Sequence, residues 1–437
     1  MSINRNRLVA FALVTVLLAG TGVAASVLKV SHTANHAVVP AAQAPGGAGA
    51  AAGSGSGSGP GGASAVAGVT VAIAPPPVAP PRVQARAALL ADEATGQVLY
   101  ERRSTQPRAM ASTTKVMTAL LALERLRPDR TVVIGAEPPR VGEESLRLHQ
   151  GERLTVRQLL LGLLVKSAND AAVALADAVD GSEVAFVRRM NRKAAELHLR
   201  STHYVTAYGL DRPGHRTSAR DLAHLWEVAM RRADFRALVT TREVRLPGSP
   251  SRLRHFVNSN QLLASYAWAV GGKTGFTSDA GRCLVASASR GGRRLVAVAL
   301  GSPDAFADVR ALFEYGFNAF SWVRLAGRGQ VVPLDTGDGS TRSYQVSRDV
   351  DALVRSDLLG KVMLVPPARR GAAAPTRVTV WLQAGGMRLA PLPLVPTDAA
   401  ASAGGQATRT TSSLKSAPVP PGSEPVAIDP LLRRAAA

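Results

Sequence analysis

The stretch RAMASTTKVMTAL, residues 108–120, places Ser112 three residues before Lys115. A serine hydroxyl is a weak nucleophile until a neighbouring base removes its proton. On a helix, residues three apart lie on one face, so the two side chains can meet. A desolvated lysine can lose its proton and act as that base, whereas arginine stays charged. Because only 7 of the 52 basic residues are lysines, the pair predicts a Ser112 nucleophile with a Lys115 general base.

The spacing alone does not identify a site, because Ser26–Lys29 and Ser412–Lys415 repeat it. Neither repeat falls in a segment that has the apolar periodicity of a helix in a folded domain. Ser112, in contrast, would begin an amphipathic helix over residues 112–126, where backbone amides favour developing negative charge. The pair at 112 and 115 is therefore the candidate, and further polar residues are needed to complete it.

Two further polar motifs follow in order. Ser167-Ala168-Asn169 comes after an apolar helical run, and Lys273-Thr274-Gly275 precedes a strand pattern. Taken singly, the first could be a helix cap or polar turn, and the second a glycine-rich loop. Gly275 would let the backbone of a ligand approach closely. Three motifs in this order within one folded segment, two of them with rare lysines, indicate an active site.

The elements that must position these residues run from strands to helices and back to strands. Residues 85–103 predict two strands joined by a turn near Glu93–Gly96. Helical periodicity follows in residues 112–126, 155–179 and 218–233, the last with Ser218 as its N-cap.

The end of the segment returns to strands. Residues 281–290 and 293–302 predict a hairpin that turns at Gly291-Gly292, and a helix follows over residues 304–320. Strands at both ends with helices between them predict an α+β domain whose sheet joins the two chain ends. Four β-rich runs, residues 329–334, 343–346, 361–366 and 377–386, predict a second, small β domain between about residues 322 and 396.

In these motifs and the blocks around them, the chain resembles the serine D-alanyl-D-alanine carboxypeptidases. These are penicillin-binding proteins of low molecular mass, related in fold to serine β-lactamases. The resemblance runs from about Ala85 to Phe320 and includes the blocks SANDAAVALADAV, HYVTAYGLDRPGHRTSARDLAHL and GGKTGFTSDAGRCLVASA. It implies a β-lactamase/transpeptidase-like fold, an antiparallel sheet with helices on both faces, here followed by the small β-rich domain.

The resemblance also implies a role for each motif residue. Ser112 would be acylated by a stem peptide ending in D-Ala-D-Ala, with Lys115 as its base. Ser167 would relay protons to the leaving amine, and Asn169 would hold Lys115 and the substrate backbone. Lys273 would raise the positive potential around the substrate carboxylate.

The remaining residues of the third motif would bind the substrate. Thr274 would contact its carboxylate, and Gly275 would allow its close approach. The backbone N–H groups of Ser112 and Phe276 would form the oxyanion hole. No metal or cofactor is implied, and β-lactams are the expected inhibitors.

Three positions depart from the family pattern. The family usually has an arginine a short distance before the Gly-Phe end of its last helix, where this chain has Ala305 or a neighbour, and Arg310 lies further along. The family's Asn-x-His appears as Thr206-Ala207-Tyr208, and its Gly-Ser-Ser block is altered in VGEESLRL. These departures concern substrate preference and rate more than mechanism.

Other functions stay open on the sequence. A serine β-lactamase shares the motifs but needs a Glu-x-x-x-Asn block for deacylation, and none occurs between Asn169 and Lys273. A DD-endopeptidase acting on peptidoglycan cross-links is hardly separable by sequence. A non-catalytic muropeptide-binding protein is a third alternative, disfavoured because all three polar motifs are retained.

Composition limits the remaining classes. A net charge of +21 suits a nucleic-acid binder, but the arginines are scattered and aromatic residues make up only 4%. We therefore predict a basic surface without nucleic-acid binding. The single cysteine, Cys283, excludes an internal disulfide and lies in an apolar run typical of a core thiol. The histidines form no metal-binding motif.

The chain ends have their own signatures. Residues 1–28 combine Arg5 and Arg7 with an apolar run, which predicts a signal peptide or signal anchor and an extracytoplasmic location, with membrane attachment possible. Gly, Ala, Ser and Pro dominate residues 29–82, a predicted disordered linker. We expect the peptidase domain over 83–320, the β-rich domain over 321–396 and a disordered tail over 397–437.

Overall fold

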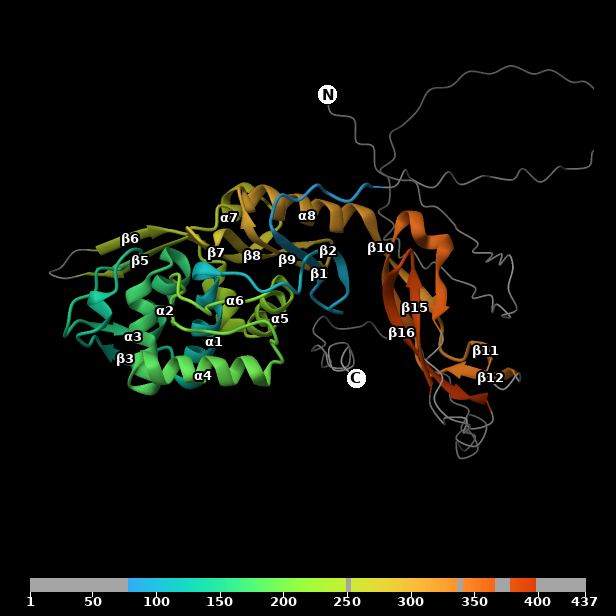
Figure 1. Cartoon of the computed structure of the whole chain (residues 1–437), viewed down its shortest axis with the longest axis horizontal. Coiled ribbons are helices and arrows are strands. Elements are labelled where there is room, and N and C mark those ends of the chain that lie inside the picture. The colour runs from blue at the N-terminus through green and yellow to red at the C-terminus, as the bar shows by residue number, and fades with distance from the viewer. Residues whose placement is uncertain (1–77, 249–252, 336–340, 366–377, 398–437) are drawn as a thin grey trace, which may run out of the picture. The chain divides into compact units, whose positions relative to one another are not determined.

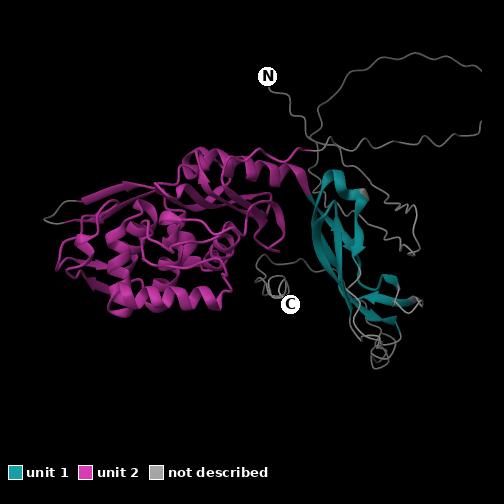
Figure 2. Ribbon diagram, in the orientation of Figure 1, with its two compact units in different colours: residues 1–77, 321–410 teal, residues 78–320, 411–437 magenta. Residues whose placement is uncertain are grey.

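A computed structural model describes residues 78–248, 253–335, 341–365 and 378–397. These residues form two compact units, one spanning residues 78–320 and the other beginning at Ser321 (Figure 2). The predicted signal segment, the tail after Thr397 and nearly all of the predicted linker lie outside the described residues. No helix in the described ranges is long and apolar enough to cross a membrane.

The larger unit contains one five-stranded antiparallel sheet in the order β2-β1-β9-β8-β7. Its strands are β1 (Ala87–Asp92), β2 (Val98–Arg102), β7 (Ala269–Thr277), β8 (Gly281–Arg290) and β9 (Arg293–Ser302). β1, near the start of the unit, pairs with β2 on one side and with β9, near the end of the unit, on the other, so the sheet joins both chain ends as predicted. The predicted hairpin is also confirmed, since Arg290 pairs with Arg293 across Gly291-Gly292.

Helices cover both faces of this sheet (Figure 1). On one face α8 (Ala305–Ala319) packs so closely that a side chain on Gly316 would clash with Leu90 and Leu295. On the other face lie α5 (Ala219–Met230) and α6 (Ala233–Val239), with Ser218 capping α5 through its hydroxyl as predicted. A short helix, α7 (Leu262–Ser265), leads into β7. The predicted α+β fold is therefore confirmed.

The rest of the larger unit is a helical region whose apolar core is continuous with side chains of the sheet and of α5 and α6. It comprises the 3-10 turn η1 (Ala111–Thr114), α1 (Lys115–Arg125), α2 (Val156–Leu161), the π-helical turn η3 (Gly162–Lys166), α3 (Asn169–Asp180) and α4 (Glu183–Glu196). It also contains the turn η2 (Pro138–Arg140) and two two-stranded antiparallel sheets, β3 (Thr131–Val133) with β4 (Arg153–Thr155) and β5 (Glu243–Pro247) with β6 (Leu253–Val257).

In two places the structure refines what the sequence predicted. The chain turns at Ser167, whose φ of 70° is left-handed, so residues 155–179 form two separate helices, α2 and α3. Lys273-Thr274-Gly275 is followed by a strand, β8, as predicted, but the motif itself also lies within a strand, β7, at the edge of the sheet. Both differences place polar side chains at the boundary between sheet and helical region.

The smaller unit is β-rich. Its five-stranded sheet has the order β11-β12-β16-β15-β14, and β10 (Phe320–Ala326) pairs with β13 (Val350–Arg355). The sheet strands are β11 (Val331–Asp335), β12 (Thr341–Val346), β14 (Met363–Val365), β15 (Val378–Ala384) and β16 (Met387–Pro396), with the turn η4 (Ser356–Lys361) before β14. Its core contains Leu325, Val354, Val380, Leu382 and Leu392.

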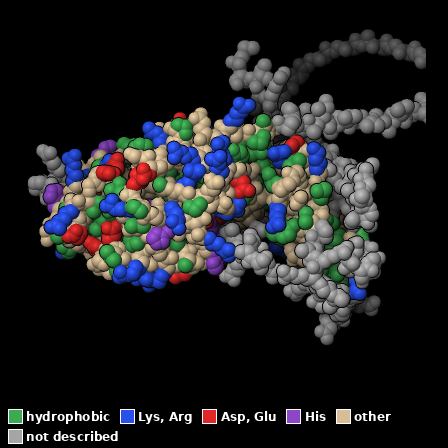
Figure 3. Space-filling view, in the orientation of Figure 1, with side chains coloured by type: hydrophobic (Ala, Val, Ile, Leu, Met, Phe, Trp, Pro, Cys, Tyr) green, Lys and Arg blue, Asp and Glu red, His purple; other side chains and the backbone are tan. Residues whose placement is uncertain are grey.

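Basic side chains occur across the visible face of the larger unit, with acidic side chains among them (Figure 3). The one cysteine, Cys283, is buried in the sheet, which confirms its interpretation as a core thiol.

Candidate active site

Ser112 and Lys115 lie at the junction of η1 and α1. Ser112 belongs to the 3-10 turn, so the helix that was expected to begin at residue 112 begins at Lys115. The turn begins at Ala111, whose φ of 48° is also left-handed. The Nζ atom of Lys115 lies 2.6 Å from the Oγ atom of Ser112, which is hydrogen-bonding distance.

Lys115 is completely buried and has two further partners. Its Nζ atom lies 2.8 Å from Oδ1 of Asn169 and 2.7 Å from the carbonyl oxygen of Tyr208. Burial lowers the pKa of Lys115 well below its ordinary value, and the charge of Lys273 lowers it further. The site thus favours the neutral amine, which is the form that can accept a proton.

Ser167 and Asn169 face different lysines. The left-handed backbone of Ser167 and the extended backbone of Ala168 end the π-helical turn and start α3 at Asn169. The Oγ atom of Ser167 accepts from Lys273, whereas Oδ1 of Asn169 accepts from Lys115. The side-chain nitrogen Nδ2 of Asn169 donates to the carbonyl of Gly142 at 3.1 Å, which fixes the orientation of the side chain.

Lys273 projects from β7 into the same buried region. Its Nζ atom lies 2.9 Å from Oγ of Ser167 and 2.7 Å from the carbonyl oxygen of Thr274. Burial lowers the pKa of Lys273 to about 7, against a smaller opposing effect of Glu144. The hydroxyl of Thr274 lies 2.7 Å from the hydroxyl of Ser259, which is hydrogen-bonding distance.

Gly275 brings β7 against η1. A β-carbon at this position would lie 2.8 Å from the backbone nitrogen of Ser112 and 3.0 Å from the Cβ atom of Ala111. The close approach that we predicted for Gly275 therefore involves the protein's own η1 backbone. The next residue, Phe276, is 65% exposed.

Several residues that support the site were not predicted from the sequence. The carbonyl of Tyr208 holds Lys115, and a side chain on Gly209 would clash with the carbonyl of Ala111. His215 contacts the hydroxyl of Thr114 at 2.7 Å through Nε2, and burial lowers its pKa to about 4, so it is neutral at pH 7. A backbone carbonyl carries no residue-type signal, but Gly209 and His215 belong to a block that the family resemblance covers.

The family departures also have structural outcomes. Arg310 donates to the carbonyl and hydroxyl oxygens of Ser265, away from the motif residues, and Ala305 is buried at the start of α8. The hydroxyl of Thr206 accepts from the backbone N–H of Gly209 and so shapes the loop that holds Lys115. Ser145 donates to Asp170, which also accepts from the backbone of Leu146 and Leu148.

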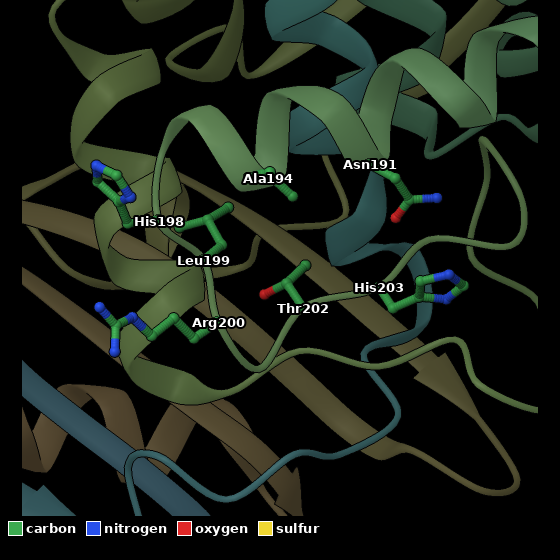
Figure 4. A pocket seen from close by; sticks show the side chains of 8 residues that line it. Asn191, Ala194, His198, Leu199, Arg200, Thr202 and His203 are labelled. Carbon is green, nitrogen blue, oxygen red and sulfur yellow. The ribbon is translucent and has the colours of Figure 1, made fainter. Parts of the chain in front are cut away.

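The described ranges contain no group of three or more His, Cys, Asp or Glu residues that could hold a metal. A hollow of about 300 Å³ lies between the end of α4 and the loop that follows it (Figure 4). Its lining includes Asn191, His198, Arg200 and His203, and it shares no residue with the Ser112 network. The hollow is separate from the candidate active site.

Comparison with known proteins gives a consistent family. Residues 74–304, which are 231 of the 437, match the model of the D-alanyl-D-alanine carboxypeptidase family, peptidase family S11. D-alanyl-D-alanine carboxypeptidase DacF of Bacillus subtilis is 34% identical over 257 residues, which are 57% of this chain and 66% of DacF. DacD of Escherichia coli K12 is 38% identical over 269 residues, covering 58% of this chain and 68% of DacD.

Solved structures agree with these relatives. A D-alanyl-D-alanine carboxypeptidase from Mycobacterium tuberculosis superposes with a TM-score of 0.53 at 36% identity, covering 55% of this chain and 94% of that one. The Streptomyces K15 DD-transpeptidase gives a TM-score of 0.53 at 31% identity and is covered to 99%. Because the family match covers more than half of the chain and the solved relatives share its fold, the chain belongs to the D-alanyl-D-alanine carboxypeptidase family of penicillin-binding serine hydrolases.

Proposed function

We propose that this chain removes the terminal D-alanine from peptidoglycan stem peptides ending in D-Ala-D-Ala, through an acyl-enzyme on Ser112. The observation that carries this proposal is the set of three partners around Lys115. Asn169 Oδ1 and the Tyr208 carbonyl can only accept hydrogen bonds, so they use both N–H groups of a neutral amine. The remaining lone pair then faces the hydroxyl of Ser112. A neutral Lys115 is thus oriented to take the proton of Ser112.

Acylation begins with that proton transfer. As Lys115 takes the proton, Ser112 Oγ forms a bond to the carbonyl carbon between the two D-alanines. The carbonyl oxygen gains negative charge and accepts hydrogen bonds from the N–H groups of Ser112 and Phe276. The contact of Gly275 with the Ser112 backbone supports this placement, because it brings β7 next to the nucleophile.

Collapse of the tetrahedral intermediate breaks the peptide bond. The leaving amine takes up the proton held on Lys115, and we assign its relay to Ser167. Lys273 donates to Oγ of Ser167 at 2.9 Å and orients that hydroxyl. Release of D-alanine leaves the shortened peptide esterified to Ser112.

In deacylation, water is the nucleophile and Ser112 is the leaving group. A water molecule gives its proton to Lys115 and attacks the ester, and Ser112 recovers its proton when the peptide leaves. A β-lactam opens its ring on Ser112 without releasing a separate amine, so its fragment stays in the site. β-Lactams are therefore the expected covalent inhibitors.

The proposed location is the outer side of the cytoplasmic membrane. The family's substrate supports this, and so does the signal-like composition of residues 1–28. Attachment to the membrane through the same apolar segment is part of the proposal. Fractionation of cells that express the full chain, with and without residues 1–28, would test both points.

Labelling of the purified full-length protein with a fluorescent penicillin tests the nucleophile. We expect covalent labelling of the wild type and none of Ser112→Ala. Ser412→Ala is the matched control, since it removes the serine of the same spacing in Ser412–Lys415. Equal labelling of Ser112→Ala and wild type would overturn the assignment.

Release of D-alanine from a pentapeptide, compared with cleavage of a cross-linked dimer, tests the reaction. We expect the pentapeptide to be the better substrate. Labelling by penicillin together with cleavage of the dimer alone would favour the endopeptidase alternative. Labelling without any hydrolysis would favour a muropeptide-binding protein.

A further inference from the structure

A carboxypeptidase substrate ends in a carboxylate, which needs a cation beside the site. The two buried lysines are already engaged. Lys115 contacts Ser112, Asn169 and Tyr208, and Lys273 contacts Ser167 and the Thr274 carbonyl. With a pKa of about 7, Lys273 also carries only part of a charge at neutral pH. A permanent cation must come from elsewhere.

Other cations near these elements are paired. Lys166 forms an ion pair with Glu144. Arg310 donates to Ser265 and lies with its Cζ atom 5.8 Å from the ring centre of Tyr266. Where the family resemblance implies an arginine, the chain has Ala305 or a neighbour, none of which is an arginine, and Ala305 is buried. None of these residues offers a free charge to a carboxylate at β7.

Arg282 differs from all of them. It is exposed, and across the described ranges its guanidinium forms no hydrogen bond or ion pair. Its Cζ atom lies 5.6 Å from the ring centre of Phe276, so the exposed ring supports it by a cation–π contact. An arginine held this way can form two hydrogen bonds to a carboxylate.

Strand register fixes where Arg282 lies. On β8 it is opposite Phe276 of β7 and also opposite Ser302 of β9, two residues before α8 begins its cap at Asp304. β8 lies between β7 and β9 (Figure 1). Arg282 therefore lies on the strand next to the edge strand β7, which carries Lys273-Thr274-Gly275, and its guanidinium extends over Phe276 of that strand.

Thr274 lies on the same face of β7 as Phe276, because residues two apart on a strand share a face. A peptide along the edge of β7, with its scissile carbonyl at Ser112, has its last residue beside these two side chains. The Thr274 hydroxyl and the Arg282 guanidinium then border one position. That position suits the terminal carboxylate.

We propose that Arg282 binds the C-terminal carboxylate of the substrate and supplies the charge that Ala305 cannot. This assignment rests on the proposed function, since it takes the D-Ala-D-Ala peptide as substrate. Arg282 is thus a specificity-determining residue that favours peptides with a free carboxyl end.

The test compares a diacetyl-L-Lys-D-Ala-D-Ala peptide with its C-terminal carboxamide, using full-length wild type, Arg282→Ala and Arg282→Lys. For Arg282→Ala we expect the preference for the acid, measured as a ratio of kcat/KM values, to fall roughly 10- to 100-fold. Most of the change should be in KM for the acid. Arg282→Lys should recover part of the preference, because it restores a charge without the planar guanidinium.

Arg310→Ala is the matched control, since it removes an arginine that contacts Ser265 and should leave the ratio unchanged. An unchanged ratio in Arg282→Ala would overturn the proposal. A fall that Arg310→Ala reproduces would overturn it too, because the effect would then be structural.

Acylation by benzylpenicillin, compared with its methyl ester, gives the same ratio without turnover. We expect Arg282→Ala to slow acylation by the acid and to leave the ester little changed. A wild type that is labelled by penicillin but releases no D-alanine would contradict the proposed function, while the acid-to-ester ratio would still decide the role of Arg282.

Discussion

The Nζ atom of Lys115 lies 2.7 Å from the carbonyl oxygen of Tyr208. This backbone contact gives the buried amine a second partner that can only accept, beside Oδ1 of Asn169. An ammonium group can donate to all three partners, and a neutral amine fits the same partners when Ser112 donates. Burial of the amine and the charge of Lys273 favour the neutral form. The loop that ends at Gly209 therefore helps to hold the amine in place beside Ser112.

The first prediction is that Lys115→Arg loses acylation by penicillin by about 10²- to 10⁴-fold, although it keeps a basic side chain. The guanidinium cannot deprotonate, so no base remains for Ser112. Lys166→Arg is the control, because Lys166 pairs with Glu144 as a charged group. The rates at which fluorescent penicillin labels the two variants test this prediction. A wild-type rate in Lys115→Arg would show that Lys115 is not the base for Ser112.

The second prediction concerns pH. Lys273 is charged below its pKa of about 7 and neutral above it, so kcat/KM for D-alanine release should fall as the pH rises through about 7. Acylation also needs the neutral form of Lys115, whose pKa is lowered by burial and by Lys273, so activity should fall at low pH as well. The expected profile is a bell.

Glu144 allows this profile to be shifted. Its carboxylate raises the pKa of both lysines, so Glu144→Gln should move both sides of the bell to lower pH. Glu196→Gln, at the end of α4, should leave the profile in place. If the falling side does not move in Glu144→Gln, Lys273 is not the group that titrates there.

The residues with specialised chemistry could be predicted from the sequence, because only certain side chains perform it. Lys115 and Lys273 are rare lysines with a chemical reason for their type. The contribution of Tyr208 could not be predicted, because every residue has a backbone carbonyl. A cap or polar turn at Ser167 was one interpretation of the sequence, but its left-handed backbone could not be predicted, since neither glycine nor proline signals it there.

One strand also could not be predicted from the sequence. β16 was missed because Pro391 and Pro393 argue against a strand. The strand forms nevertheless, because β15 pairs along most of its length while β12 pairs only with Leu394–Pro396. Those two prolines therefore have no β12 residue opposite them. Tertiary pairing of this kind is not encoded in a local sequence pattern.

The third prediction is that Gly275→Ala reduces acylation by about 10²-fold in a protein that stays folded. The new methyl group would lie 2.8 Å from the Ser112 nitrogen, so η1 and β7 must move apart. That movement separates the two N–H groups proposed for the oxyanion hole. Gly135→Ala is the control, because no atom lies within 4 Å of its β-carbon position. Wild-type acylation by Gly275→Ala, with thermal unfolding measured in parallel, would show that the close approach is dispensable.

The fourth prediction concerns stability and uses Glu93, which directly follows β1 and contacts none of the motif residues. Glu93 accepts from the hydroxyl of Ser287, which in turn accepts from the indole N–H of Trp226 at 2.7 Å. Burial raises the pKa of Glu93 to about 7, despite the hydrogen bond from Ser287 and the charge of Arg294. The carboxyl group is therefore easier to protonate in the folded chain than in the unfolded one.

The sign of the pH effect follows from this difference. Between about pH 4.5 and 7 the folded state binds more protons than the unfolded state, so the free energy of unfolding falls as the pH rises through this window. Glu93→Gln is uncharged at every pH and should reduce this fall by on the order of 1–3 kcal/mol. Asp92 and Glu227, whose pKa values are also raised by burial, leave a residual slope of the same sign. Urea unfolding at both ends of the window measures the difference, with the exposed Glu137→Gln as control. A slope in Glu93→Gln equal to that of the wild type would show that Glu93 is already ionised in the folded protein throughout the window.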